Sequence, residues 1–146
     1  MIQQPRTWLN TQTEHEGFPI YSRRPNVRVD EFEVLRPGYP TLLTITHVLT
    51  HVKQNGLPEA EYNESLEELD SAIIAPFRDE TNGLIAVVET FAGKRTYYVY
   101  LTQLFDPEAY MHEVRIRFPH EDLSCEQRAD PTWRLFNGYA RDFQFA

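Results

Sequence analysis

The sequence is poor in cysteine, in glycine and in long apolar runs. Its single cysteine, Cys125, excludes an internal disulfide and a thiolate-rich metal site. With six glycines in 146 residues there is little material for a phosphate-binding loop, and no Gly-x-Ser-x-Gly nucleophile motif is present. No apolar run approaches the roughly 20 residues that a membrane span needs, and the first ten residues do not resemble a signal peptide. We therefore expect a cytoplasmic protein that does not contact a membrane.

Positive charge is also scarce. The net charge is −8, and residues 41–83 contain eight acidic residues but only two basic ones. An acidic chain is repelled by the phosphate backbone, so we expect no nucleic-acid partner. The aromatic strand around Tyr97, Tyr98 and Tyr100 is of a kind that stacks RNA bases in some domains. Because the sequence signature of those domains is missing, packing is the favoured interpretation of these tyrosines.

Apolar spacing predicts alternating strands and helices from residue 41 onward. TLLTITHVLTH alternates with period two, which is typical of a strand. Between Pro58 and Pro76 apolar residues recur every three or four positions, which predicts one helix. GLIAVVETF and RTYYVYL predict a hairpin around Ala92-Gly93-Lys94. Asp106-Pro107-Glu108 starts a second helix that ends near Phe118, and DLSCEQR predicts a last strand.

The order strand, helix, strand, strand, helix, strand over residues 41–129 predicts a ferredoxin-like split β-α-β sandwich. In this α+β fold two helices cover one face of an antiparallel sheet. Residues 1–40 predict an N-terminal β-hairpin around Glu16-Gly17 and a surface connector, and residues 130–146 form an aromatic tail that docks on the rest. We predict a single domain over residues 1–146. The apolar second face of the sheet must be covered by the hairpin, by the tail or by a second subunit, so a homodimer is one hypothesis.

The most acidic stretch, NGLPEAEYNESLEELDSAI at residues 55–73, has six carboxylates and no basic residue. Because these carboxylates fall mostly away from the apolar stripe, we interpret them as the solvated side of a helix. An electrostatic partner surface and a metal site are the alternatives. His47 and His51 share one face of a strand but lie roughly 13 Å apart, too far to bind one metal ion. The sequence thus predicts no catalytic residue, no metal ligand and no cofactor.

Five short stretches span nearly the whole chain, and their order and spacing carry more information than any one of them. They are Trp8, Tyr39-Pro40, Asn55-Gly56-Leu57-Pro58, residues 93–100 and Asp130-Pro131-Thr132-Trp133. In this order they resemble the bacterial family catalogued as domain of unknown function number 695. That family usually has a tyrosine a few positions after the last tryptophan, where this chain has Phe136 and, further on, Tyr139.

The resemblance implies a fold and no catalytic residues, because the family has no established activity. Some of its members are joined to a domain similar to the protein inhibitor of ribonuclease E, an acidic ferredoxin-like regulator, which implies a regulatory or protein-binding role. The leading hypothesis is therefore a non-enzymatic protein-interaction module with an unidentified protein partner. Since Tyr and Trp dominate binding hot spots, we expect its partner or ligand surface at Tyr98, Tyr100, Trp133, Arg134, Phe136 and His47.

The alternative hypothesis is a small-molecule-binding protein or an enzyme of unrecognised type, with its site between the sheet and the N-terminal hairpin. Its polar groups would be Arg134, Arg95, His47 and Glu89, because binding sites combine apolar walls with a few convergent polar groups. This hypothesis requires a pocket larger than about 300 Å³.

Overall fold

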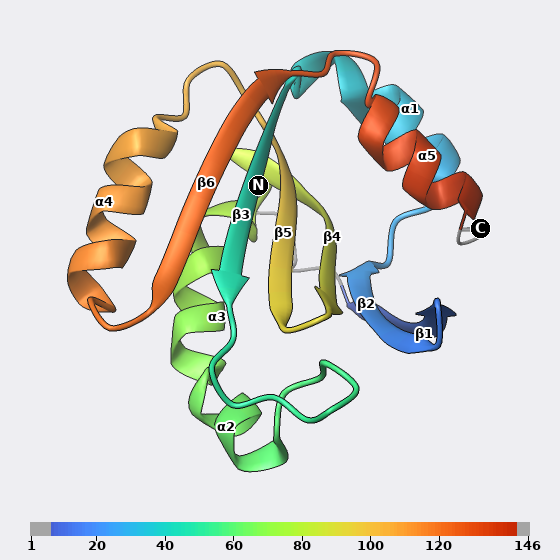
Figure 1. The fold of residues 1–146 in the computed structure, drawn as a ribbon. Helices are drawn as coiled ribbons and strands as arrows, with labels where there is room; N and C mark the ends of the chain where they lie inside the picture. The colour runs from blue at the N-terminus through green and yellow to red at the C-terminus, as the bar shows by residue number, and fades with distance from the viewer. Residues whose placement is uncertain (1–6, 143–146) are drawn as a thin grey trace.

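The computed structural model describes residues 7–142, so the last four residues of the predicted tail lie outside the described part. Six strands form one antiparallel sheet in the order β1-β2-β4-β5-β3-β6 (Figure 1). The strands are β1 Trp8–His15, β2 Phe18–Pro25, β3 Thr41–Val48, β4 Gly83–Phe91, β5 Lys94–Leu101 and β6 Asp122–Ala129. The helices are α1 Val29–Leu35, α2 Ala60–Ser65, α3 Glu67–Ile74, α4 Pro107–Arg117 and α5 Arg134–Asp142, with short 3-10 turns at Arg36–Gly38 and Ala75–Phe77. The predicted α+β class is confirmed.

Both faces of the sheet are covered by helices of the same chain. On one face α3 and α4 pack against a core of β3, β4 and β5, to which Leu43, Ile73 and Met111 contribute. On the other face α1 and α5 pack over Leu42, Leu84 and Tyr100 (Figure 1). The second face is thus covered by the C-terminal tail together with α1, so the homodimer hypothesis loses its motivation and stays untested.

The two predicted hairpins form where the turn residues allow it. Ala92 and Gly93 both have positive φ, 53° and 81°, as a two-residue hairpin turn between β4 and β5 requires. Glu16 and Gly17, with φ of 52° and 86°, do the same between β1 and β2. The β1-β2 hairpin joins the sheet through β2, which pairs with β4 over only three positions, from Tyr21 to Arg23. The hairpin therefore extends one edge of the sheet.

The single helix predicted between Pro58 and Pro76 is wrong in its continuity. Pro58 forms an isolated bridge with Val52, and the helix begins two residues later, at Ala60. The helical path is interrupted at Leu66, which ends α2 and precedes α3, and whose side chain is buried. Apolar spacing alone did not reveal the break, because Leu66 lies within an apolar stripe that continues through both helices.

The connector predicted between the hairpin and β3 contains a helix, α1, so that prediction is corrected. Asp30 and Glu31 lie in its first turn, and the Arg28 backbone N–H donates to Glu31 Oε1 at 3.3 Å. Phe32 is buried against α5, with its ring centroid 4.5 Å from that of Phe136. Burial of Phe32 stabilises the helix against the cluster on this second face of the sheet, which we call the second core. Among residues 7–142, no helix is long and apolar enough to cross a membrane.

Candidate functional site

A cleft with two adjacent cavities lies between the β1-β2 hairpin and the helices α2 and α3, and we call it the hairpin cleft. Its larger cavity has a volume of about 430 Å³ and its smaller one about 150 Å³. Trp8, Arg23 and Asp70 line both. The larger cavity is further lined by Asn10, Tyr21, Asn63, Glu64, Leu66, Glu67, Val88, Thr90 and Arg95.

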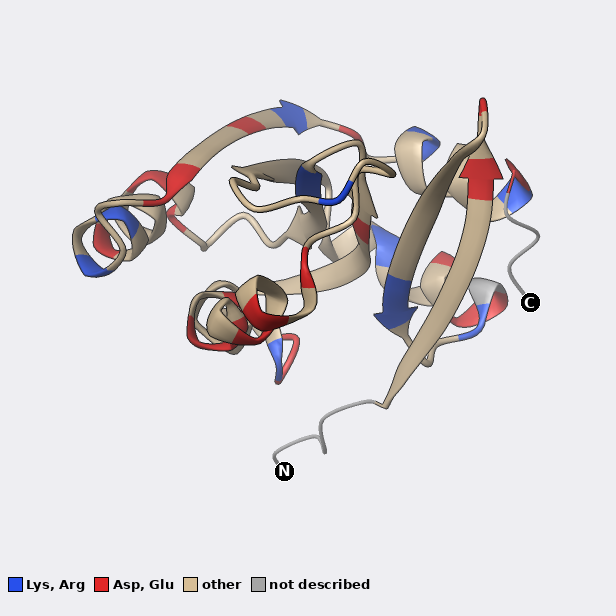
Figure 2. Ribbon diagram, turned by 60° about the horizontal axis from the view of Figure 1, so that its bottom comes forward, with Lys and Arg blue, Asp and Glu red and all other residues tan. Residues whose placement is uncertain are grey.

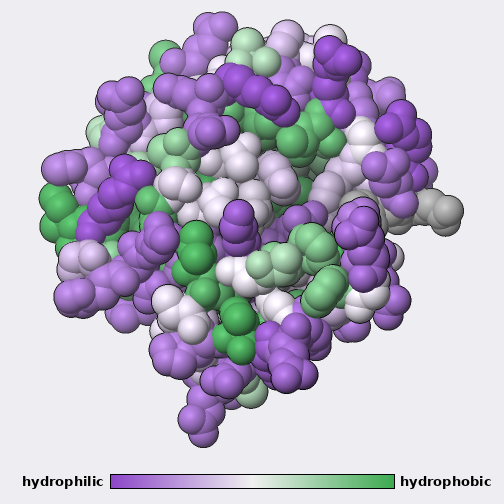
Figure 3. Space-filling view, in the orientation of Figure 1, coloured by the Kyte–Doolittle hydropathy of each residue, from purple (hydrophilic) through white to green (hydrophobic). Residues whose placement is uncertain are grey.

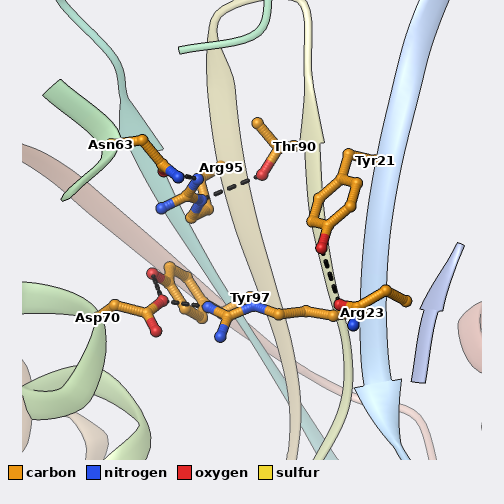
Figure 4. Close-up of polar contacts among 8 residues, drawn as sticks. Tyr21, Arg23, Asn63, Asp70, Thr90, Arg95 and Tyr97 are labelled. Carbon is orange, nitrogen blue, oxygen red and sulfur yellow. Dashed lines mark hydrogen bonds and ion pairs between the residues drawn. The ribbon is translucent and has the colours of Figure 1, made fainter. Parts of the chain in front are cut away.

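Strand register places the sheet residues of this cleft in two neighbouring rows. Tyr21 pairs with Thr90, and Thr90 pairs with Arg95, so these side chains form one row across β2, β4 and β5. Two positions along, where side chains return to the same face, Arg23 pairs with Val88 and Val88 with Tyr97. The helices α2 and α3 lie over this face and add Asn63 and Asp70. Residues far apart in the chain thus surround one space (Figure 4).

Arg23 bridges the hairpin and α3. Its side chain extends from β2 to Asp70, where Nη2 forms an ion pair with Oδ1, and the Tyr97 hydroxyl donates to the same oxygen at 2.6 Å (Figure 4). The guanidinium also lies over the Trp8 ring, 5.1 Å from its centroid. Burial, and then the nearby Asp70 carboxylate, raise the pKa of Tyr97, which keeps this hydroxyl neutral and able to donate. The charge of Arg23 is therefore matched inside the protein.

Arg95 differs from Arg23 in its partners. Its side chain is only 9% exposed, yet it lines the larger cavity. Arg95 Nε donates to Thr90 Oγ1 at 3.1 Å and Nη2 donates to Asn63 Oδ1 at 2.7 Å, and both acceptors are uncharged (Figure 4). Within residues 7–142 no carboxylate forms an ion pair with it. The hairpin cleft thus contains a nearly buried cation without a matching anion.

The predicted aromatic surface lies inside the protein. Tyr100, Trp133 and Phe136 are each at most 1% exposed and belong to the second core, beneath α1. The Tyr100 and Trp133 rings stack with centroids 4.1 Å apart, and Trp133 Nε1 donates to the Tyr39 carbonyl at 2.9 Å. The sequence showed these residues as apolar but not that the connector folds into a helix that covers them. The structure brings them together as core, and their contact with a partner stays a prediction.

The remaining predicted site residues are dispersed. Arg134 is exposed on α5, and Tyr98 is half-buried below Tyr139, with ring centroids 6.4 Å apart. Burial raises the pKa of Tyr98 to about 12 and also raises the pKa of Glu89, which lies on the same face as Tyr98. His47 is buried on the opposite face, and its Nε2 lies 2.7 Å from Glu121 Oε2.

Of the four polar groups predicted for a small-molecule site, only Arg95 lines the hairpin cleft. His47 is the register partner of Arg95 on β3, but its ring contacts Glu121 instead of the cavity. Glu89 and Arg134 belong to the face that α5 covers. Because the hairpin is itself part of the sheet, the larger cavity lies between the sheet with its hairpin and the helices α2 and α3. Its volume is above the 300 Å³ that the hypothesis required, and the small-molecule site stays a prediction.

Sequence reasoning missed Arg23, Asp70 and Trp8. A signal existed for Asp70, since it lies four residues after Leu66 and three before Ile73, at the margin of the apolar stripe instead of opposite it. Its assignment to the solvated side of a helix is corrected, because it binds Arg23 and Tyr97. Nothing in the sequence indicated that Arg23 would reach it.

Asp130 connects β6 to α5 through hydrogen bonds to its carboxylate. Its Oδ1 accepts from the Arg134 backbone N–H at 2.9 Å, and its Oδ2 accepts from the Tyr100 hydroxyl at 2.8 Å and from the Leu135 backbone N–H at 3.3 Å. Burial alone would raise the pKa of Asp130, but these hydrogen bonds outweigh it and hold the pKa below its usual value.

We expect Asp130→Asn to lower the free energy of unfolding at pH 7 by about 1 to 3 kcal/mol. A carboxyl whose pKa is lowered in the folded state stabilises the fold at pH values above its unfolded pKa, which is near 3.9. This contribution is lost as the pH falls through the folded pKa. The difference between wild type and Asp130→Asn in urea unfolding should therefore shrink from pH 7 to pH 3. The exposed Glu113→Gln serves as control, and a difference for Asp130→Asn that does not change with pH would contradict this account.

Comparison with known proteins identifies one family. The model of a family described as "Family of unknown function (DUF695)" matches residues 8–139, which confirms the resemblance found in the sequence. No curated protein matches the chain significantly. No solved structure does so either.

Proposed function

We propose that this chain, which belongs to the family of unknown function DUF695, binds a small molecule in the hairpin cleft through an anionic group, with a carboxylate as the simplest case. The observation that carries the proposal is Arg95, a nearly buried guanidinium that lines the cavity and has only uncharged hydrogen-bond partners among the described residues. A buried charge is costly unless it is paired. An anionic ligand would supply the missing pair.

The neighbours of Arg95 support an acceptor ligand. Because the Asn63 side-chain oxygen accepts from Arg95, its Nδ2 remains available to donate, and the Thr90 hydroxyl is likewise left to donate. Guanidinium, amide and hydroxyl donors suit the oxygens of a carboxylate. Trp8, Leu66 and Val88 add apolar walls, and a volume of about 430 Å³ falls in the range of small-molecule sites.

The test uses the fluorescence of Trp8, which lines the cleft, whereas Trp133 is buried on the opposite side of the sheet. We expect 3-phenylpropionate to change this fluorescence saturably and its neutral amide, 3-phenylpropanamide, to bind far more weakly. Arg95→Met should weaken binding of the acid about tenfold or more, because charge-assisted hydrogen bonds are lost. Arg95→Lys keeps the charge but not the planar guanidinium. Its affinity for the acid should therefore lie between those of wild type and Arg95→Met.

Two controls make this result specific. Arg128→Met removes an exposed guanidinium from β6 and should leave binding unchanged. Trp8→Phe should remove the fluorescence change but not the binding heat measured by calorimetry. Equal binding of acid and amide, or equal affinity of wild type and Arg95→Met when both are folded by circular dichroism, would refute the proposal.

A protein-interaction role is the second candidate, and it would be non-enzymatic and regulatory in kind. Phe18 and Val52, 46% and 37% exposed, flank a cavity of about 300 Å³ where the β1-β2 turn approaches residues 52–56. On the face drawn in Figure 3, however, hydrophobic side chains appear in several separate groups with hydrophilic side chains between them. Native mass spectrometry of the gently purified protein separates the two candidates, since a bound small molecule and a bound protein add very different masses.

We also propose that residues 41–129 have a ferredoxin-like arrangement and form one part of a single domain. Its support is the strand order β4-β5-β3-β6, in which the first and third strands of the β-α-β-β-α-β unit are neighbours at the centre. The helices α3 and α4 follow the first and third strands and pack on the same face.

The single cysteine supports the reducing environment of the cytoplasm as the location.

A further inference from the structure

The hairpin cleft has a second charged feature, at its rim. Glu64 and Glu67 both line the larger cavity and are both exposed. Glu64 directly follows Asn63, whose side chain binds Arg95, and Glu67 lies just beyond the helix break at Leu66. Within the described part of the chain neither carboxylate has a basic ion-pair partner, whereas the adjacent Glu68 is 3.7 Å from Arg117 on the other side of α3. Figure 2 shows acidic residues along α2 and α3, as well as on other elements such as α4 and β6.

The charges of the cleft thus lie at different depths below the protein surface. The ion pair of Arg23 with Asp70 is internally matched. In the larger cavity there remain one nearly buried cation, Arg95, and two exposed anions, Glu64 and Glu67. A ligand with only a carboxylate would match Arg95 but would be repelled by the rim. A ligand with only an ammonium group would match the rim but leave Arg95 unpaired.

We infer that the ligand of the hairpin cleft is a zwitterion of the amino-acid class, bound with its carboxylate on Arg95 and its ammonium group toward Glu64 and Glu67. The inference rests on the proposed function and specifies its ligand. The side chain of such a ligand lies along Trp8, Leu66 and Val88, the apolar part of the wall. An aromatic or branched aliphatic side chain fits this lining, since both gain free energy from leaving water.

The experiment is isothermal titration calorimetry of the full chain with two matched series at low ionic strength. The first contains L-phenylalanine, 3-phenylpropionate and phenethylamine, and the second contains L-leucine, 4-methylpentanoate and 3-methylbutylamine. Within at least one series we expect the zwitterion to bind roughly fivefold or more tightly than the acid, the size that one partly screened charge pair contributes. The amine should bind most weakly because it leaves Arg95 unpaired. The preference should decline as salt is added.

A double variant, Glu64→Gln with Glu67→Gln, identifies the groups responsible. In this variant the affinity of the zwitterion should fall to that of the deaminated acid, whereas the affinity of the acid should stay the same or rise. Glu68→Gln is the matched control, since it removes a neighbouring carboxylate that does not line the cleft. It should leave the ratio of the two affinities unchanged.

The outcomes separate this inference from the proposed function. If in both series the acid binds as tightly as the amino acid, or if the double variant keeps the wild-type ratio, the zwitterion is refuted while binding of an anion to Arg95 stands. If neither acids nor amino acids bind, both the inference and the proposed function are refuted.

Discussion

Trp133→Ala should lower the free energy of unfolding by about 3 to 5 kcal/mol, the range for large aromatic side chains removed from a core. Trp133 is 1% exposed and contacts the rings of Tyr100, Phe32 and Phe136. The alanine variant loses these contacts and the hydrogen bond from Nε1 to Tyr39, and leaves a cavity between α1, α5 and β5. Urea unfolding followed by far-ultraviolet circular dichroism measures the loss without depending on tryptophan fluorescence.

A second substitution at this position distinguishes packing from hydrogen bonding. Trp133→Phe keeps a ring against Tyr100 but loses the donor to the Tyr39 carbonyl, so we expect a smaller loss, of about 1 to 2 kcal/mol. An exposed binding anchor would behave differently, because most surface substitutions change stability by less than about 0.5 kcal/mol. A loss that small for Trp133→Ala would return Trp133 to the surface role that the sequence suggested.

Gly56→Ala should be the most destabilising single-methyl change among the glycines with positive φ. Gly56 has a φ of +87°, and a Cβ built there would lie 2.8 Å from the Ala92 Cα, which is a backbone atom and not the end of a flexible side chain. Adding about 1 to 2 kcal/mol for the left-handed backbone to about 1 to 3 kcal/mol for overpacking, we expect a loss of roughly 2 to 5 kcal/mol.

Gly93→Ala is the matched control for this effect. Gly93 also has positive φ, +81°, but a Cβ there would meet nothing within 4 Å, so only the cost of the backbone conformation remains, about 1 to 2 kcal/mol. The two glycines are in direct contact, since the Gly93 N–H donates to the Gly56 carbonyl at 2.9 Å. Equal losses for the two alanine variants in urea unfolding would show that the close approach to Ala92 costs nothing.

These contacts explain the Asn-Gly-Leu-Pro stretch in structural terms. The Asn55 side chain accepts from the Leu57 N–H at 3.0 Å, Gly56 lies against the β4-β5 turn, and Pro58 pairs with Val52. Together they fold residues 51–58 back onto the hairpin turn and set the point at which α2 begins. The stretch therefore acts on the hairpin cleft indirectly, by positioning the helix that carries Asn63.

The amino-acid sequence by itself determined several local elements of this protein, although not α1 or the break between α2 and α3. Period-two alternation predicted β3, and the residues Ala92-Gly93 predicted the β4-β5 turn, because a two-residue hairpin requires positive φ at both. Asp106 predicted the start of α4, and its carboxylate accepts from the Glu108 and Ala109 N–H groups. Such features depend on residues within a few positions of one another, so they can be read along the chain.

Only the tertiary structure decided what these elements enclose. Arg23 and Asp70 are 47 residues apart, and Arg95 and Asn63 are 32 apart, and each pair meets because strand register and helix packing bring its members to one cleft. The same holds for the tail. The sequence showed its aromatic residues, but their burial depends on α1, which packs on the face of the sheet opposite to the hairpin cleft. Whether an arginine is paired or an aromatic ring is exposed is determined by neighbours distant in sequence, and no local pattern contains them.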